Sequence, residues 1–121
     1  MPIKKILVVD DSPTERQFML ETLSKLGYQV VLAENGEEGV AKARTELPDL
    51  VLMDVVMPGS NGFQATRQIA RDEATRHIPV IICTTKSQET DRIWGMRQGA
   101  RDYIVKPADA GELAAKIAAL G

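Results

Sequence analysis

Short apolar runs alternate with longer amphipathic stretches along the whole chain. The apolar runs cover residues 5–9, 29–33, 50–53, 80–83 and 103–105, and they are rich in β-branched side chains. Strands without polar alternation are typical of parallel sheets that are covered by helices on both faces. The pattern therefore predicts an α/β protein.

The intervening stretches carry helix start signals. Ser12-Pro13-Thr14-Glu15 is a capping box with proline at the first helical position. Asn35, Asn61 and Asp109 begin further helices in the same way, and another helix is predicted over 88–98. The apolar residues expected to face the sheet are Met19, Leu23, Leu26, Val40, Ala43, Leu47, Phe63, Ile69, Ile93, Met96, Ala100, Leu113, Ile117 and Leu120.

Five strand–helix units fill the 121 residues, which is about the length of one domain. Right-handed crossovers leave few topologies for such a chain. We predict a flavodoxin-like, doubly wound parallel sheet of the (βα)5 type with strand order 2-1-3-4-5. In such sheets, ligands bind at the carboxyl ends of the strands, near the switch between the first and third strands.

Composition excludes several function classes. The net charge is −2 and the pI is near 5.4, so the chain lacks the overall basic field of a nucleic-acid-binding domain. The longest apolar run, over residues 6–9, is far too short to span a membrane. A single cysteine, Cys83, and a single histidine, His77, exclude an internal disulfide and Cys-rich or multi-His metal sites. We therefore expect a cytoplasmic protein without nucleic-acid binding or membrane insertion.

Polar side chains follow four of the predicted strands. Asp10 and Asp11 follow the first strand, Asp54 the third, Thr84 the fourth and Lys106 the fifth. Each alone is most often a turn or cap residue, but the topology brings all of them to one edge of the sheet. Three neighbouring carboxylates repel one another and should hold a cation, and oxygen ligands favour Mg²⁺. Asp54, from the central strand, is then the best nucleophile for a phosphoryl group.

These segments resemble the receiver domains of two-component response regulators. The resemblance rests on residues 8–12, 53–59, Thr84 and 102–107, and it covers essentially the whole chain. It implies a single receiver domain over 1–121 without an output domain. The residues to which it assigns roles are Asp54 as phosphoacceptor; Asp10, Asp11, Asp54 and the backbone carbonyl of Val56 as ligands of Mg²⁺, with Mn²⁺ as a substitute; Thr84 and Lys106 as phosphoryl-binding groups; and Tyr103 as the switch aromatic.

The resemblance also implies how the protein acts. A histidine kinase or a phosphotransfer protein would phosphorylate Asp54, and the surface of the fourth helix, fifth strand and fifth helix would then control a partner. Residues 89–100 most resemble single-domain regulators of type IV pilus twitching motility, of the PilH kind. We therefore expect a monomeric signalling protein, not an enzyme, with a motility protein as its unknown target. In this family the Lys106–Pro107 bond is typically cis.

Some residues depart from the commonest receiver pattern or leave two interpretations open. Thr85 is bulkier than the usual residue after the switch threonine. Val56 cannot hydrogen-bond an attacking water, and Lys86 is a long cation near the same entry path. We therefore expect the aspartyl phosphate to hydrolyse more slowly than it would with asparagine at position 56. Trp94 is either a tryptophan lying over its neighbours or a partner anchor on the surface of the fourth helix, fifth strand and fifth helix. Cys83 is expected to pack as a small hydrophobic residue.

Two other functions compete with the phosphorylated switch. One is a receiver fold that binds a partner regardless of phosphorylation. The other is a phosphatase of the haloacid dehalogenase type, which also uses an aspartate nucleophile but usually has a second acid two residues later, where this chain has Val56.

Overall fold

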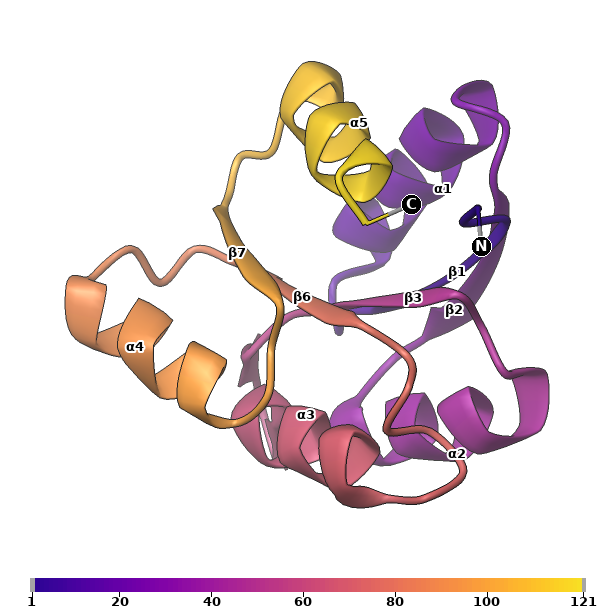
Figure 1. Ribbon diagram of the computed structural model, residues 1–121. Helices are drawn as coiled ribbons and strands as arrows, with labels where there is room; N and C mark the ends of the chain where they lie inside the picture. The colour runs from indigo at the N-terminus through magenta and orange to yellow at the C-terminus, as the bar shows by residue number, and fades with distance from the viewer. Residues whose placement is uncertain (1, 121) are drawn as a thin grey trace.

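A five-stranded parallel sheet forms the centre of the molecule (Figure 1). The computed structural model describes residues 2–120. The strands are β1 (Lys5–Val9), β2 (Gln29–Ala33), β3 (Leu50–Met53), β6 (Val80–Thr84) and β7 (Asp102–Val105). Their order is β2-β1-β3-β6-β7, which is 2-1-3-4-5 when only the strands of this sheet are counted. The predicted flavodoxin-like topology is therefore confirmed.

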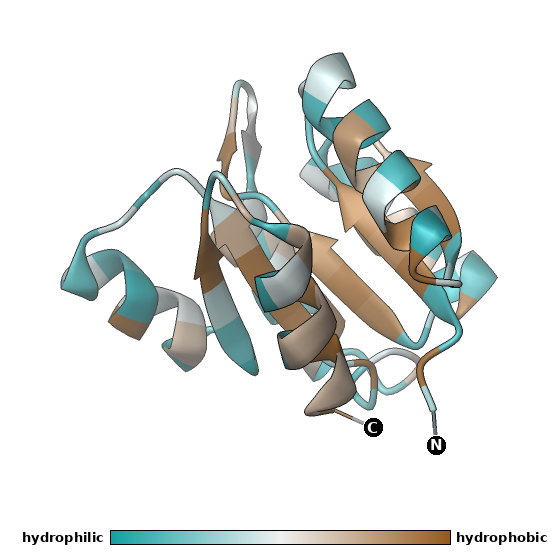
Figure 2. Cartoon of the chain, turned by 90° about the horizontal axis from the view of Figure 1, so that it is seen from above, coloured by the Kyte–Doolittle hydropathy of each residue, from teal (hydrophilic) through white to brown (hydrophobic). Residues whose placement is uncertain are grey.

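Helices cover both faces of this sheet. Helices α1 (Pro13–Lys25) and α5 (Ala110–Ala118) pack on one face, and α2 (Gly36–Glu46) and α3 (Gly62–Arg71) on the other. Helix α4 (Glu89–Arg97) lies beside the edge strand β7. Figure 2 shows that the strands are mostly apolar, whereas hydrophilic and apolar residues are mixed along the helices. This arrangement explains why the strands read as continuous apolar runs.

Three clusters of buried side chains form the core, and the two largest lie on opposite faces of the sheet. Met19, Leu23, Leu113 and Ile117 from α1 and α5 pack in the first cluster, as predicted. Ala43 and Ile69 from α2 and α3 pack in the second cluster, with Val40 partly buried against it. Phe63 packs partly buried in a third cluster that includes Ala100 and Tyr103.

Four residues predicted to face the sheet are exposed instead: Leu26, Leu47, Ile93 and Met96. Leu26 and Leu47 are the C-cap residues of α1 and α2, where the helical periodicity ends. On α4 the residue that faces the sheet is Gly95, since an added Cβ there would lie 2.5 Å from Cδ1 of Ile82. Large apolar side chains therefore lie on the flanks of α4, because a glycine occupies its contact face.

A small hairpin that we did not predict joins β3 to α3. It consists of β4 (Val56–Met57) and β5 (Ser60–Asn61), paired antiparallel. Gly59 lies in its turn with φ of +68°, a conformation that glycine adopts without a steric penalty. The hairpin holds Val56 directly beside the end of β3.

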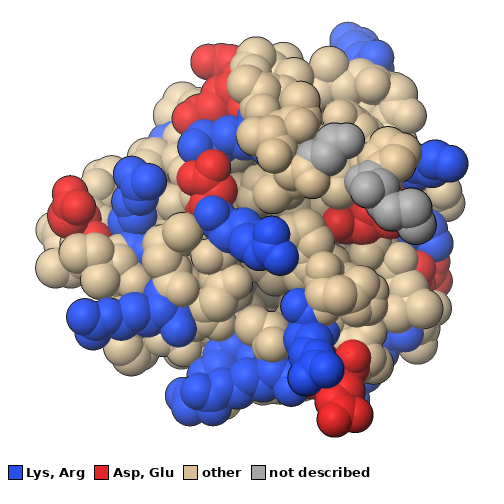
Figure 3. Space-filling model, in the orientation of Figure 1, with Lys and Arg blue, Asp and Glu red and all other residues tan. Residues whose placement is uncertain are grey.

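Charge is unevenly distributed despite the small net charge. On the face seen in Figure 3, Lys and Arg side chains gather over the lower part, where Figure 1 places α3 and the end of α4. Arg67, Arg71 and Arg97 are exposed and, within residues 2–120, form no ion pair. A search of the described residues found no helix with the length and hydropathy needed to cross a membrane.

Candidate functional site

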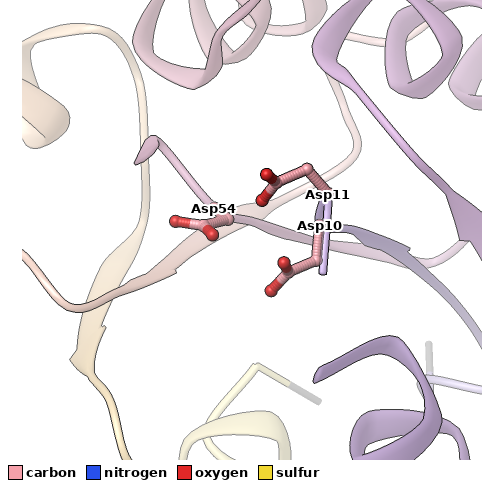
Figure 4. A group of neighbouring side chains, drawn as sticks. All are labelled: Asp10, Asp11 and Asp54. Carbon is pink, nitrogen blue, oxygen red and sulfur yellow. The ribbon is translucent and has the colours of Figure 1, made fainter. Parts of the chain in front are cut away.

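Three aspartates meet at the carboxyl ends of two adjacent strands. Asp10 follows β1 and Asp54 follows β3, and the amide of Asp54 donates a hydrogen bond to the Val9 carbonyl (3.0 Å). Figure 4 shows the carboxylates of Asp10 and Asp11 turned toward that of Asp54. One oxygen from each of the three lies within 4.8 Å of the others. Asp10 and Asp54 are only 3% and 7% exposed, so their charges are poorly hydrated and need a partner.

Lys106 supplies that partner. It follows β7, and its amide donates to the Thr84 carbonyl (2.8 Å), which fixes its position beside the end of β6. Its Nζ lies 2.5 Å from Oδ2 of Asp10 and 3.4 Å from Oδ2 of Asp54. Burial alone would lower the pKa of Lys106, but the hydrogen bond to Asp10 and the charges of Asp54 and Asp10 raise it overall. The lysine is therefore a cation held among carboxylates, and its bond to Pro107 is cis.

Backbone amides orient two of the carboxylates. The amide of Ser12 donates to Oδ1 of Asp10, and the amide of Val56 donates to Oδ1 of Asp54, both at 3.0 Å. In each aspartate, the other oxygen faces Lys106. One oxygen of Asp54 is thus held by the backbone, and the second is directed into the site.

A cavity of about 390 Å³ opens over these groups. The structure brings five of the predicted site residues into its lining, namely Asp10, Asp11, Asp54, Val56 and Lys106, together with Ser12, Glu15, Thr85 and Pro107. Val56 is 45% exposed at the opening. Thr84, Tyr103 and Lys86 do not line the cavity in this conformation.

Thr84, Lys86 and Tyr103 instead form a connected group behind the cavity. Thr84 is fully buried, and its hydroxyl accepts a long hydrogen bond (3.4 Å) from the amide of Lys86. The hydroxyl of Tyr103, a buried residue, donates to the carbonyl of Lys86 (2.9 Å). Burial, with smaller contributions from Asp91 and Asp54, raises the pKa of Tyr103 to about 12. Tyr103 is therefore a neutral hydrogen-bond donor at physiological pH.

Glu15 is a member of the site that sequence reasoning missed. Its Oε2 lies 3.7 Å from Nζ of Lys106, and it lines the cavity. The sequence indicates a capping box, in which the glutamate would reach back to the amide of Ser12. Only half of the box forms: Ser12 Oγ accepts from the Glu15 amide (3.3 Å), but the Ser12 amide donates to Asp10. The sequence offers one signal for this role: Glu15 lies in the first turn of a helix that directly follows Asp10 and Asp11.

The remaining singled-out residues lie apart from this cavity. Trp94 is 51% exposed on α4, and His77 is exposed before β6. Cys83 is buried within β6, as expected, and burial raises the pKa of its thiol to about 12. A thiol that stays protonated in a packed core is a structural residue.

Known proteins share both the sequence and the fold. The family described as "Response regulator receiver domain" matches residues 6–118. Protein PilH of Pseudomonas aeruginosa is 65% identical over 105 residues, which is 87% of each chain. The phosphate regulon transcriptional regulatory protein PhoB of the same organism is 39% identical over 97% of this chain, but this chain spans only 51% of that relative.

Solved structures agree with this assignment. The chemotaxis protein CheY4 of Vibrio cholerae superposes with a TM-score of 0.91 at 30% identity, covering 98% of this chain and 99% of that one. The receiver domain of the Pseudomonas aeruginosa sensor histidine kinase PA1611, with a magnesium ion in its active-site cleft, gives 0.87 at 33% identity and covers 94% and 93%. The chain belongs to the response regulator receiver domain family and has a role in two-component phosphorelay signalling.

Proposed function

We propose that Asp54 is the phosphoacceptor and that a histidine kinase or a phosphotransfer protein supplies the phosphoryl group. The observation that carries the proposal is the position of the Asp54 carboxylate, beside two other carboxylates and an ammonium, in a cavity that a donor can enter. The single histidine of the chain, His77, is outside this cavity. The donor histidine therefore belongs to a partner.

The geometry of Asp54 supports one attacking oxygen. Its Oδ1 accepts from the Val56 amide, so Oδ2 is the oxygen that attacks. As the new bond from Oδ2 to phosphorus forms, the bond from phosphorus to the donor nitrogen breaks, and that nitrogen keeps the electron pair. Lys106, 3.4 Å from Oδ2, is placed to bind an oxygen of the transferred group.

The acidic donor set fits a magnesium ion. Asp10, Asp11, Asp54 and the backbone carbonyl of Val56 would hold Mg²⁺, or Mn²⁺ in its place, since hard oxygen ligands suit both ions. When bound, the ion would neutralise carboxylates that otherwise repel an incoming phosphoryl group.

The group behind the cavity supports a route for the switch. If Thr84 Oγ1 moves toward a phosphoryl oxygen, it loses the weak hydrogen bond that it accepts from the Lys86 amide. The carbonyl of the same residue, Lys86, accepts a hydrogen bond from the Tyr103 hydroxyl. The Tyr103 ring lies next to Gly95, where an added Cβ would be 3.5 Å from Cδ2. A movement of Thr84 can therefore affect α4 through Lys86, Tyr103 and Gly95, each of which contacts the next. The phosphoryl group must favour one of the two arrangements to shift their populations.

The two flanks of α4 offer separate contacts to a partner. Arg92 and Trp94 are both exposed on α4. Trp94 is rotated by about 200° from Arg92. Trp94 and Arg92 therefore project from different sides of the helix, and the place of Trp94 in the partner surface of α4, β7 and α5 stays a prediction.

Trp94→Ala tests whether this side chain anchors a partner. An exposed tryptophan at an interface centre typically contributes about 2 kcal/mol or more, so affinity should fall at least about tenfold. Titration of the phosphorylated protein against its target measures this, with Phe18→Ala, an exposed aromatic on α1, as control. Unchanged affinity would show that Trp94 only covers its neighbours.

We further propose that the protein acts in the cytoplasm in type IV pilus twitching motility or chemotaxis, as a monomer. The support is the 65% sequence identity to PilH over 87% of each chain and the structural similarity to CheY4. It acts either on a motility protein or as a sink for phosphoryl groups. Its chemistry is limited to its own phosphorylation and dephosphorylation.

Two alternatives are separated from this proposal by simple measurements. A phosphorylation-independent binding module would bind its partner equally well with Asp54→Asn. A phosphatase of the haloacid dehalogenase type would turn over a phosphomonoester continuously, but Val56 stands where that chemistry usually has a second acid.

The proposal is tested by incubating the protein with acetyl phosphate and Mg²⁺. One phosphoryl group should be added, and borohydride reduction followed by peptide mass mapping should locate it on Asp54. EDTA should prevent the reaction, and beryllofluoride with Mg²⁺ should raise Tm because the complex binds only the folded state. A protein that gains no phosphoryl group and shows no change in Tm would overturn the proposal.

Val56→Asn should shorten the lifetime of the aspartyl phosphate. Val56 lies at the cavity opening and cannot hydrogen-bond a water, whereas asparagine can position one for attack. We expect hydrolysis to be about threefold to tenfold faster, a modest fraction of what a positioned catalytic group contributes. The decay of phosphorylated protein after removal of the donor measures this rate. Val56→Leu, which stays apolar, should decay like the wild type; equal decay of all three proteins would refute the role of Val56.

A further inference from the structure

Glu15 adds a fourth carboxylate to a cavity that, among the described residues, is lined by one basic side chain, Lys106. Lys106 Nζ is within 4.0 Å of Asp10, Asp54 and Glu15, and Asp11 lies beside them. A divalent cation and the Lys106 ammonium together would balance three carboxylates. With Glu15 present, one negative charge is left over, and the incoming phosphoryl group is itself an anion.

The position of Glu15 is determined by the backbone. Its amide is held by Ser12 Oγ, and the Ser12 amide is occupied by Asp10, so the carboxylate has no backbone amide to reach. It is 39% exposed, whereas the side chain of Lys106 is only 8% exposed. Glu15 therefore lies where the cavity meets solvent, within 3.7 Å of the Lys106 ammonium.

We propose that Glu15 acts as an electrostatic brake on phosphorylation of Asp54. It repels the anionic donor, and it competes with the phosphoryl group for Lys106. This inference rests on the proposed function and assigns the control of its rate to a residue of this chain. Glu15 does not react: during transfer from acetyl phosphate, phosphorus leaves the acetyl oxygen, acetate departs with the electron pair, and the new bond forms to an Asp54 oxygen.

Glu15→Gln should speed phosphorylation by acetyl phosphate about threefold to fivefold at low ionic strength, which is the size expected from one partly exposed charge. The same change should weaken Mg²⁺ binding, measured by calorimetry without any donor, because a negative charge near the metal ligands is lost. A general structural disturbance would lower both quantities. Salt should speed the wild type more than Glu15→Gln, because screening removes the same repulsion.

Glu21→Gln is the matched control. It removes one charge from the same helix, and its carboxylate accepts from Gln17 rather than facing Lys106. It should behave as wild type in rate, Mg²⁺ binding and salt response. If the wild type is phosphorylated and Glu15→Gln is no faster, the brake is refuted while the proposed function stands. If neither protein is phosphorylated, the proposed function itself fails.

Discussion

Replacing Asp54 with asparagine should abolish phosphorylation of the protein by acetyl phosphate or by a kinase. The amide keeps an oxygen that can accept from the Val56 amide, so the local backbone has no reason to move. It lacks the anionic oxygen that attacks phosphorus, and we expect the rate to fall at least about a hundredfold. Mg²⁺ affinity should fall as well, by about tenfold or more, because an anionic ligand is lost.

Asp109→Asn provides the control for this loss. Asp109 is the N-cap of α5, and asparagine caps a helix about as well as aspartate does, so the variant loses the same charge without losing the cap. It should be phosphorylated at the wild-type rate, as measured by mass spectrometry over time. An Asp54→Asn protein that is phosphorylated normally would show that another carboxylate, Asp10 or Asp11, is the acceptor.

Sequence patterns predicted the sheet well for a physical reason. Strands buried on both faces must be apolar throughout, so their boundaries fall where polar residues begin, as at Asp10 and Asp54. The topology then placed the strand-end side chains at one edge, and the structure confirms that Asp10, Asp11, Asp54 and Lys106 meet there. Their roles in phosphorylation stay predictions.

The same patterns failed on α4 and at Glu15. On α4 the contact with the sheet is made by Gly95, so a search for an apolar stripe selected Ile93 and Met96, which are exposed. Glu15 was missed because its capping-box spacing already explained it. Its carboxylate contacts Lys106, a residue distant in the sequence, and only the folded structure shows that contact.

Gly62→Ala should destabilise the protein by about 3 kcal/mol or more, although alanine normally stabilises a helix relative to glycine by about 0.5–1 kcal/mol. Gly62 is the first residue of α3, and an added Cβ would lie 2.0 Å from the Asp54 carbonyl oxygen and 2.7 Å from Cα of Val55. Both atoms belong to the backbone, so no side-chain rotation relieves the overlap, and the cost should reach the upper part of the range for overpacking.

The displacement caused by Gly62→Ala would also act on the site, because it pushes against the backbone of the phosphoacceptor itself. Urea denaturation should show a lower midpoint, and the fraction that remains folded should be phosphorylated more slowly than wild type. Gly111→Ala is the control: this glycine is exposed near the start of α5, and its added Cβ would meet no backbone atom within 4 Å, only Oδ1 of the Asp109 side chain at 3.1 Å. That variant should unfold within about 1 kcal/mol of wild type. If Gly62→Ala unfolds at the same urea concentration as Gly111→Ala, then α3 can shift without cost, and the close contact between its first residue and Asp54 does not hold the site in place.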